Sequence, residues 1–147
     1  AGKKPLAVES KFTEFYQHEG TSNFKPSYFS KPRLWDRFPR CEQLAKAIYD
    51  GQMIFRRLDA AQLLKHILGL KKAFPSGFKL LYIWYMAPSK AADIHQKEIL
   101  MFEDHVKSEV DFRQMTYQDL FRTIKEISGI DPGYISYLND RYFGDLS

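Results

Sequence analysis

The segment that most constrains the fold is GFKLLYIWYM, an apolar, aromatic and β-branched run that lies between Gly77 and Pro88. A continuous apolar run of this length, bounded by turn-forming residues, is typical of a strand that is buried on both faces of a sheet. We therefore expect this segment to form the centre of a β-sheet.

The segments around this strand have the apolar spacing of helices. The stretch RCEQLAKAIYDGQMIFRRL is expected to be helical, and DAAQLLKHILGL to be a second helix or a continuation after a break near Gly51. After the strand, a long helix should begin at Ser89 or between Ala92 and Asp93, followed by a short strand, a helix near Tyr117 and a last Tyr-rich helix. This order predicts an α/β fold, with a mixed central β-sheet flanked by helices in one domain over residues 1–147.

The first residues predict another strand. Between residues 5 and 13 the side chains alternate between two faces, one with Leu6, Val8, Ser10 and Phe12 and the other with Ala7, Glu9, Lys11 and Thr13. The following stretch, residues 20–39, is rich in Ser, Asn, Pro and aromatic residues, which indicates a long ordered loop held by aromatic anchors.

Composition bounds the class of protein. A chain of 147 residues with 44% hydrophobic content can bury one sizeable core. Its longest apolar runs are too short for a membrane span, and its first residues lack the apolar core of a signal peptide. Cys41 is the only cysteine and therefore has no partner for an internal disulfide. We expect a cytoplasmic protein without a membrane partner.

The charge is moderately basic. Twenty-two Lys and Arg residues against eighteen Asp and Glu give a formal charge of +4. The basic residues gather in short clusters, several of which include aromatic side chains, such as SKPRLWDRFPR. Such clusters suit a nucleic-acid backbone, but they are also typical of solvated loops, and charge alone favours the solvated loops.

Glu9 and Lys11 form the one pair in the opening strand with evident chemistry. Residues two apart on a strand project from the same face, with Cβ atoms roughly 6 to 7 Å apart. A carboxylate can bind a hard cation such as Mg²⁺, and a nearby ammonium can stabilise phosphate charge or help to activate water. Phosphodiester hydrolysis needs this combination of groups. The alternative is a surface ion pair, on a strand with its polar face outward, worth under about 1 kcal/mol.

The stretch AVESKFTE resembles the ExK half-motif of the PD-(D/E)XK nuclease superfamily. The resemblance covers residues 5–86, and the first ten of these carry its specific motif. It implies a restriction-endonuclease-like fold and the activity of a metal-dependent DNA endonuclease. In that activity Glu9 would be catalytic and bind Mg²⁺ or Mn²⁺, and Lys11 would be a second catalytic residue. It further implies that Gln62, on the later helix, orients water or contacts the DNA backbone.

The sequence departs from this family at one point. In the superfamily an Asp on a preceding strand shares the metal with the Glu, and residues 1–4 contain no acid. Gly2, Lys3 and Lys4 are typical of a hairpin tip, so we expect a C-terminal fragment that lacks its N-terminal part. Glu14, Glu19 and Asp36 are the candidate substitutes for the missing acid.

The missing acid leaves two interpretations of the function. The chain is either a nuclease that another acid completes, or a catalytically inactive nucleic-acid-binding or protein-interaction module that keeps the fold. An open sheet edge would also allow a homodimer to form through strand pairing.

The helix that begins near Asp59 places Gln62 and His66 on one face. We expect His66 to contact DNA. Asp59 and Gln62 also fit the capping pattern that begins a helix, which would occupy Gln62 without catalysis. For the DNA backbone itself, the predicted contacts are Lys31, Arg33, Arg37 and Arg40.

His95 and His105 share a predicted helix, but ten residues of helix separate them by about 15 Å along the axis, too far to bind one metal ion. We expect both to be surface residues.

Overall fold

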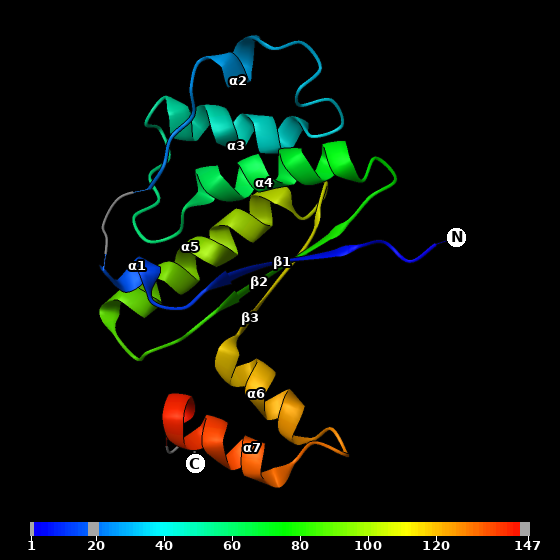
Figure 1. The fold of residues 1–147 in the computed structure, drawn as a ribbon. Coiled ribbons are helices and arrows are strands. Elements are labelled where there is room, and N and C mark those ends of the chain that lie inside the picture. Colours follow the sequence, from blue (N-terminus) through cyan, green and yellow to red (C-terminus); the bar gives the residue numbers. More distant parts are fainter. Residues whose placement is uncertain (1, 18–20, 145–147) are drawn as a thin grey trace.

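The computed structural model describes residues 2–17 and 21–144 and shows an α/β fold. Its sheet has three strands in the order β1–β2–β3, namely β1 (Leu6–Lys11), β2 (Lys79–Trp84) and β3 (Asp111–Thr116) (Figure 1). The prediction that the segment before Pro88 forms the centre of the sheet is confirmed.

The strand directions correct the prediction of a mixed sheet. Both strand pairs among the described residues are parallel, with Leu6 opposite Lys79 and Lys79 opposite Asp111. The physical reason lies in the connections, because helices between successive strands return the chain to the end of the sheet where it started. The apolar pattern identifies strands, but it does not set their direction.

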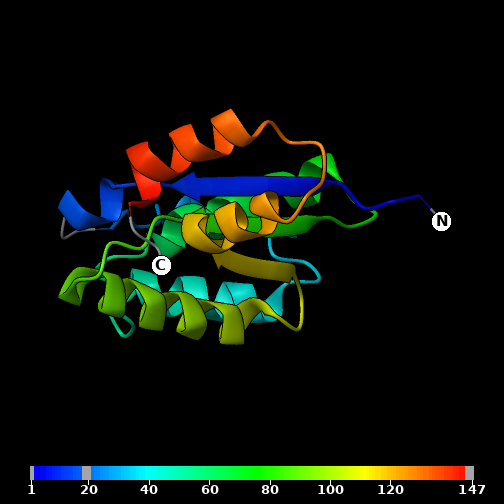
Figure 2. The same ribbon diagram turned by 90° about the horizontal axis from the view of Figure 1, so that it is seen from below.

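Helices lie on both sides of the sheet, as predicted, although part of the face that carries Leu6 and Val8 stays exposed. Between β1 and β2 lie α1 (Glu14–Gln17), α2 (Ser27–Ser30), α3 (Pro39–Tyr49) and α4 (Ala60–Ala73), and α5 (Lys90–Val106) connects β2 to β3. After β3 come α6 (Tyr117–Lys125), α7 (Pro132–Leu138) and the π-helical turn η1 (Asn139–Phe143). The helices α3, α4 and α5 lie on one side of the sheet, and α6 and α7 lie on the other (Figures 1 and 2). None of the helices in the described ranges has the length and apolarity that a membrane span needs.

The core fills the layer between the sheet and α3 to α5. Its largest fully buried side chains include Trp84 and Tyr82 of β2 and Phe102 of α5. The long loop before α3 is held as predicted, because Phe24 and Trp35 are buried in the same cluster. The loop is therefore a fixed part of the fold.

The helix starts follow the capping residues expected from the sequence. Asp59 caps α4 by accepting a hydrogen bond from the backbone N–H of Gln62, at 2.9 Å. Ser89 caps α5 in the same way through the N–H of Ala92, at 3.1 Å. Each cap satisfies a backbone donor that the first turn of a helix leaves without an intrahelical partner.

β1 has the opposite polarity to an ordinary surface strand. Leu6 and Val8 are 59% and 54% exposed, whereas Glu9 and Lys11, on the other face, are partly buried beneath α4. This overturns the alternative in which the polar face of the strand is directed outward. The fold therefore places an acid and a lysine where most strands place apolar residues.

Candidate active site

Glu9 and Lys11 form an ion pair at the carboxyl end of β1. The Nζ of Lys11 lies 3.3 Å from the Oε1 of Glu9, and the two side chains are 23% and 15% exposed. The pair is thus partly removed from water, where charges interact more strongly than on an open surface. The carboxyl ends of parallel strands are also where α/β proteins commonly bind ligands.

Helix α4 adds two side chains to this pair. The amide oxygen of Gln62 accepts a hydrogen bond from Lys11 Nζ at 3.2 Å. The Nδ1 of His66 lies 2.8 Å from Oε2 of Glu9, and the His66 side chain is 44% exposed. Four residues predicted from the sequence are thereby brought together.

The geometry of α4 explains why these two residues face β1. Leu63, Leu64 and Ile67 point into the core, which orients the helix, and residues four apart such as Gln62 and His66 lie on one face. The cap and the site do not compete for Gln62, since Asp59 binds its backbone N–H and Lys11 binds its side chain. The capping interaction therefore leaves the side chain of Gln62 beside Lys11.

The donor set for a metal ion is small. Within residues 2–17 and 21–144, no group of three or more His, Cys, Asp or Glu side chains is placed to hold a metal ion. Mg²⁺ often binds through one or two carboxylates and completes its shell with water and substrate phosphate oxygens. Glu9 is the carboxylate of this site that could serve in such a mode, and its two oxygens lie near Lys11 Nζ and His66 Nδ1.

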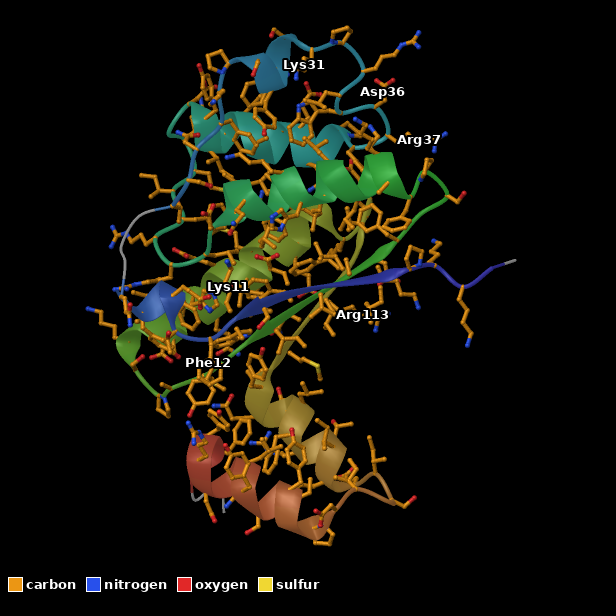
Figure 3. All side chains as sticks on the ribbon, in the orientation of Figure 1. Lys11, Phe12, Lys31, Asp36, Arg37 and Arg113 are labelled. Atoms are coloured by element: carbon orange, nitrogen blue, oxygen red, sulfur yellow. The ribbon has the colours of Figure 1, made fainter. Side chains whose placement is uncertain are left out.

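Within the described residues, the structure does not show the candidate substitutes for the missing acid in contact with Glu9 and Lys11. The carboxylate of Glu14 accepts hydrogen bonds from the N–H groups of Phe12 and Thr13, at 2.8 and 3.0 Å. Hydrogen bonds from backbone N–H groups, that of Glu14 itself foremost, lower the pKa of this carboxyl group. Asp36 lies beyond α3, far from Lys11 (Figure 3), and Glu19 lies outside the described residues.

The predicted DNA-backbone residues form a separate surface. Lys31, Arg33 and Arg37 are exposed on the loop between α2 and α3, and Figure 3 shows Lys31 and Arg37 well away from Lys11. Arg33 and Arg37 have positive φ angles of 62° and 71°, which are uncommon outside glycine and give the loop its sharp turns. Arg40, at the start of α3, donates from Nε to the carbonyl oxygen of His105 at 3.3 Å.

The prediction that His95 is a surface residue is wrong. His95 is fully buried, its ring stacks on Phe15 at 3.8 Å, and its Nε2 lies 2.9 Å from the hydroxyl of Tyr82. Burial lowers the pKa of His95 to about 3 and raises the pKa of Tyr82 above its usual range. His105 is partly buried, with Nδ1 2.8 Å from the carbonyl oxygen of Met101.

Tyr82 was not expected near the site, although it is the β2 residue opposite Glu9. Tyr82 therefore lies beside Glu9 in the sheet and also contacts His95 through its hydroxyl. The spacing of His95, three residues after Ala92 and four before Ile99, was a signal that the histidine lies on the buried face of α5.

Comparison with known families adds one finding. A family model described as "Restriction Endonuclease associating with ARP" matches residues 1–143, nearly the whole chain. Neither the curated proteins nor the solved structures gave a match.

Proposed function

Because the chain belongs to this family of restriction endonucleases associating with ARP, we propose that it is a metal-dependent DNA endonuclease of the PD-(D/E)XK type. One observation carries the proposal: the partly buried Glu9–Lys11 pair at the carboxyl end of β1, with Gln62 on its lysine. This arrangement supplies a carboxylate for a cation and an ammonium for phosphate in one small volume.

In the proposed mechanism Glu9 would hold Mg²⁺ or Mn²⁺. Such an ion would supply Lewis-acid polarisation of the phosphate and a water molecule of lowered pKa. Lys11 neutralises charge that develops on the attacked phosphate, and Gln62 fixes the direction of the lysine ammonium through its amide oxygen. His66 orients the Glu9 carboxylate and, being exposed, is placed to contact the DNA backbone.

We propose that four exposed basic residues contact the DNA backbone at a place other than the cleaved bond. They are Lys31, Arg33, Arg37 and Arg40. Contacts of Lys and Arg with phosphates position a nucleic acid without reading its sequence. Lys31 and Arg37 lie well away from Lys11 (Figure 3), so they would contact a flanking part of the substrate.

The test is isothermal titration of Mg²⁺ and Mn²⁺ into the wild type and Glu9→Gln, followed by incubation of each with plasmid DNA. We expect metal binding and nicking to disappear together in Glu9→Gln, while DNA binding persists. Glu42→Gln is the matched control, because Glu42 also pairs with a lysine, Lys46, but lies on α3. Cleavage that survives in Glu9→Gln would remove Glu9 from the mechanism.

A second candidate function is a catalytically inactive nucleic-acid-binding or interaction module. The observation that favours it is the single carboxylate of the site, with one oxygen near Lys11 and the other near His66. This candidate predicts salt-sensitive binding of DNA, and no hydrolysis with any divalent metal ion.

We also propose that β1 permits a homodimer. β1 is an edge strand among the described residues, and its apolar side chains Leu6 and Val8 are exposed. An unpaired edge of this kind is a template for strand pairing with a second copy.

A further inference from the structure

An aromatic pocket opens beside the candidate active site, on the opposite face of the sheet. It has a volume of about 440 Å³ and lies between Phe12, which directly follows β1, and the elements α6, α7 and η1. Its aromatic lining consists of Phe12, Tyr117, Phe121, Tyr142 and Phe143. The other lining residues are aliphatic, so the pocket is largely apolar. Small-ligand sites commonly have this size and character.

The walls of the pocket are held by contacts among these rings. The ring of Phe12 lies 5.4 Å from that of Tyr117 and 6.2 Å from that of Tyr142, and Phe121 stacks on Phe143 at 4.4 Å. The hydroxyl of Tyr85, at the end of β2, donates to the carbonyl oxygen of Tyr142 at 2.7 Å. The pocket is therefore preformed.

Two cations lie over the rings that line the pocket. The Nζ of Lys125 is 5.1 Å from the centre of the Phe121 ring, and the guanidinium of Arg141 is 5.6 Å from that of Tyr142. Aromatic faces that stack on bases, combined with cations that neutralise the backbone, are the means by which proteins bind unpaired nucleic acid.

The pocket and the candidate active site share one end of β1. Lys11 is the last residue of β1 and Phe12 directly follows it. Lys11 contacts Gln62 of α4, whereas Phe12 contacts Tyr117 of α6. Figure 3 shows Phe12 on the side of α6 and α7. A nucleic-acid strand that crosses this end of the sheet would meet both groups.

We propose that the pocket binds one unpaired nucleobase of the substrate, beside the phosphodiester that faces Lys11. The inference rests on the proposed function and names its substrate class, which is single-stranded or locally unpaired DNA. A base inside an intact duplex stack cannot enter a pocket, so continuous duplex must first open.

The test measures binding without cleavage, in EDTA, by fluorescence anisotropy. The probes are a labelled oligothymidylate and an abasic oligonucleotide of the same length, which has the same backbone charge but no bases. We expect the wild type to bind the oligothymidylate about tenfold or more tightly than the abasic strand, because each stacked base adds affinity.

Two variants assign this preference to the pocket. Tyr142→Ala removes a lining ring and Ile124→Trp fills the space, and both should bind the two probes alike. Their opposite effects on volume separate loss of the pocket from loss of folding, which circular dichroism melts check. Tyr134→Ala is the matched control, because Tyr134 is an exposed tyrosine of α7 outside the lining, and it should keep the preference.

The outcomes separate this inference from the proposed function. Equal binding of both probes by the wild type would overturn the pocket assignment, while plasmid nicking by the same protein would leave the endonuclease standing. If both pocket variants still prefer the oligothymidylate to the abasic strand, the assignment would also be overturned, and a protein segment would be the remaining occupant of the pocket. Failure of the wild type to bind either probe would overturn the pocket assignment as well, and plasmid nicking with Mg²⁺ or Mn²⁺ would still decide the endonuclease separately.

Discussion

At the scale of single residues, the contact between Lys11 and Gln62 is the most direct test of the site. Gln62→Ala removes the acceptor that orients the Lys11 ammonium, while leaving the cap between Asp59 and the backbone of residue 62 in place. We expect cleavage to fall by about ten- to a hundredfold with little change in stability, since small misplacements of a catalytic group are costly. Initial rates of plasmid nicking measure this.

Gln43→Ala is the control for this prediction, because Gln43 is an exposed glutamine of α3. Equal rates in the two variants would show that Gln62 has no positioning role.

The buried histidine makes a second prediction at this scale. The pKa of His95 is lowered to about 3 in the folded protein from 6.5 in the unfolded chain, because burial disfavours its charged form. The unfolded state therefore binds the additional proton as pH falls below about 6.5. This contribution to stability is fully present above that pH and is lost on descent toward pH 3, by up to about 1.4 kcal/mol per pH unit.

His95→Gln should remove this loss, because an amide does not titrate, and its side chain can still form a hydrogen bond with the Tyr82 hydroxyl. Urea unfolding of both proteins at pH 7 and pH 5 gives the comparison. If the free energy of unfolding of the two proteins declines in parallel, His95 is not the responsible group.

At the scale of elements, a buried carboxylate on α5 organises the chain before α4. Glu98 is 7% exposed and accepts hydrogen bonds from the N–H groups of Arg56, Arg57 and Leu58, at 2.7 to 2.8 Å. Glu98→Ala leaves these donors without their acceptor, so we expect a loss of about 3 kcal/mol in the free energy of unfolding. Chemical denaturation measures it.

Asp104→Asn, on the same helix, is the comparison, because Asp104 pairs with Lys107 on the surface. It should leave stability almost unchanged. A loss as large as that in Glu98→Ala would indicate that α5 tolerates no change of charge, and would remove the special role of Glu98.

The elements also show how far the sequence determines the fold. The continuous apolar run predicted β2, and Asp59 and Ser89 predicted the starts of α4 and α5, because these signals are local. Alternation in β1 correctly separated Glu9 and Lys11 from Leu6 and Val8, but it did not say which face the helices would cover. That choice depends on where α4 packs, which is a tertiary property.

In the candidate site, too, local signals could be predicted from the sequence and tertiary contacts could not. Glu9, Lys11, Gln62 and His66 were predicted from a motif and from helical spacing, and the structure brings them together. The aromatic pocket was not predicted, since its lining combines Phe12 with residues more than a hundred positions later. Such contacts follow from the chain reversals after β3, which no local pattern specifies.

At the scale of the whole molecule, the exposed face and edge of β1 predict self-association. Lysine side chains on edge strands discourage pairing between copies. Val8→Lys places a charge on the exposed apolar face of β1 and should shift a concentration-dependent dimer toward monomer, as measured by light scattering. Leu100→Lys adds the same charge at a comparably exposed leucine of α5 and should leave the dimer unchanged. A wild type that stays monomeric at every concentration would exclude pairing through β1, and the candidate site would then act within one chain.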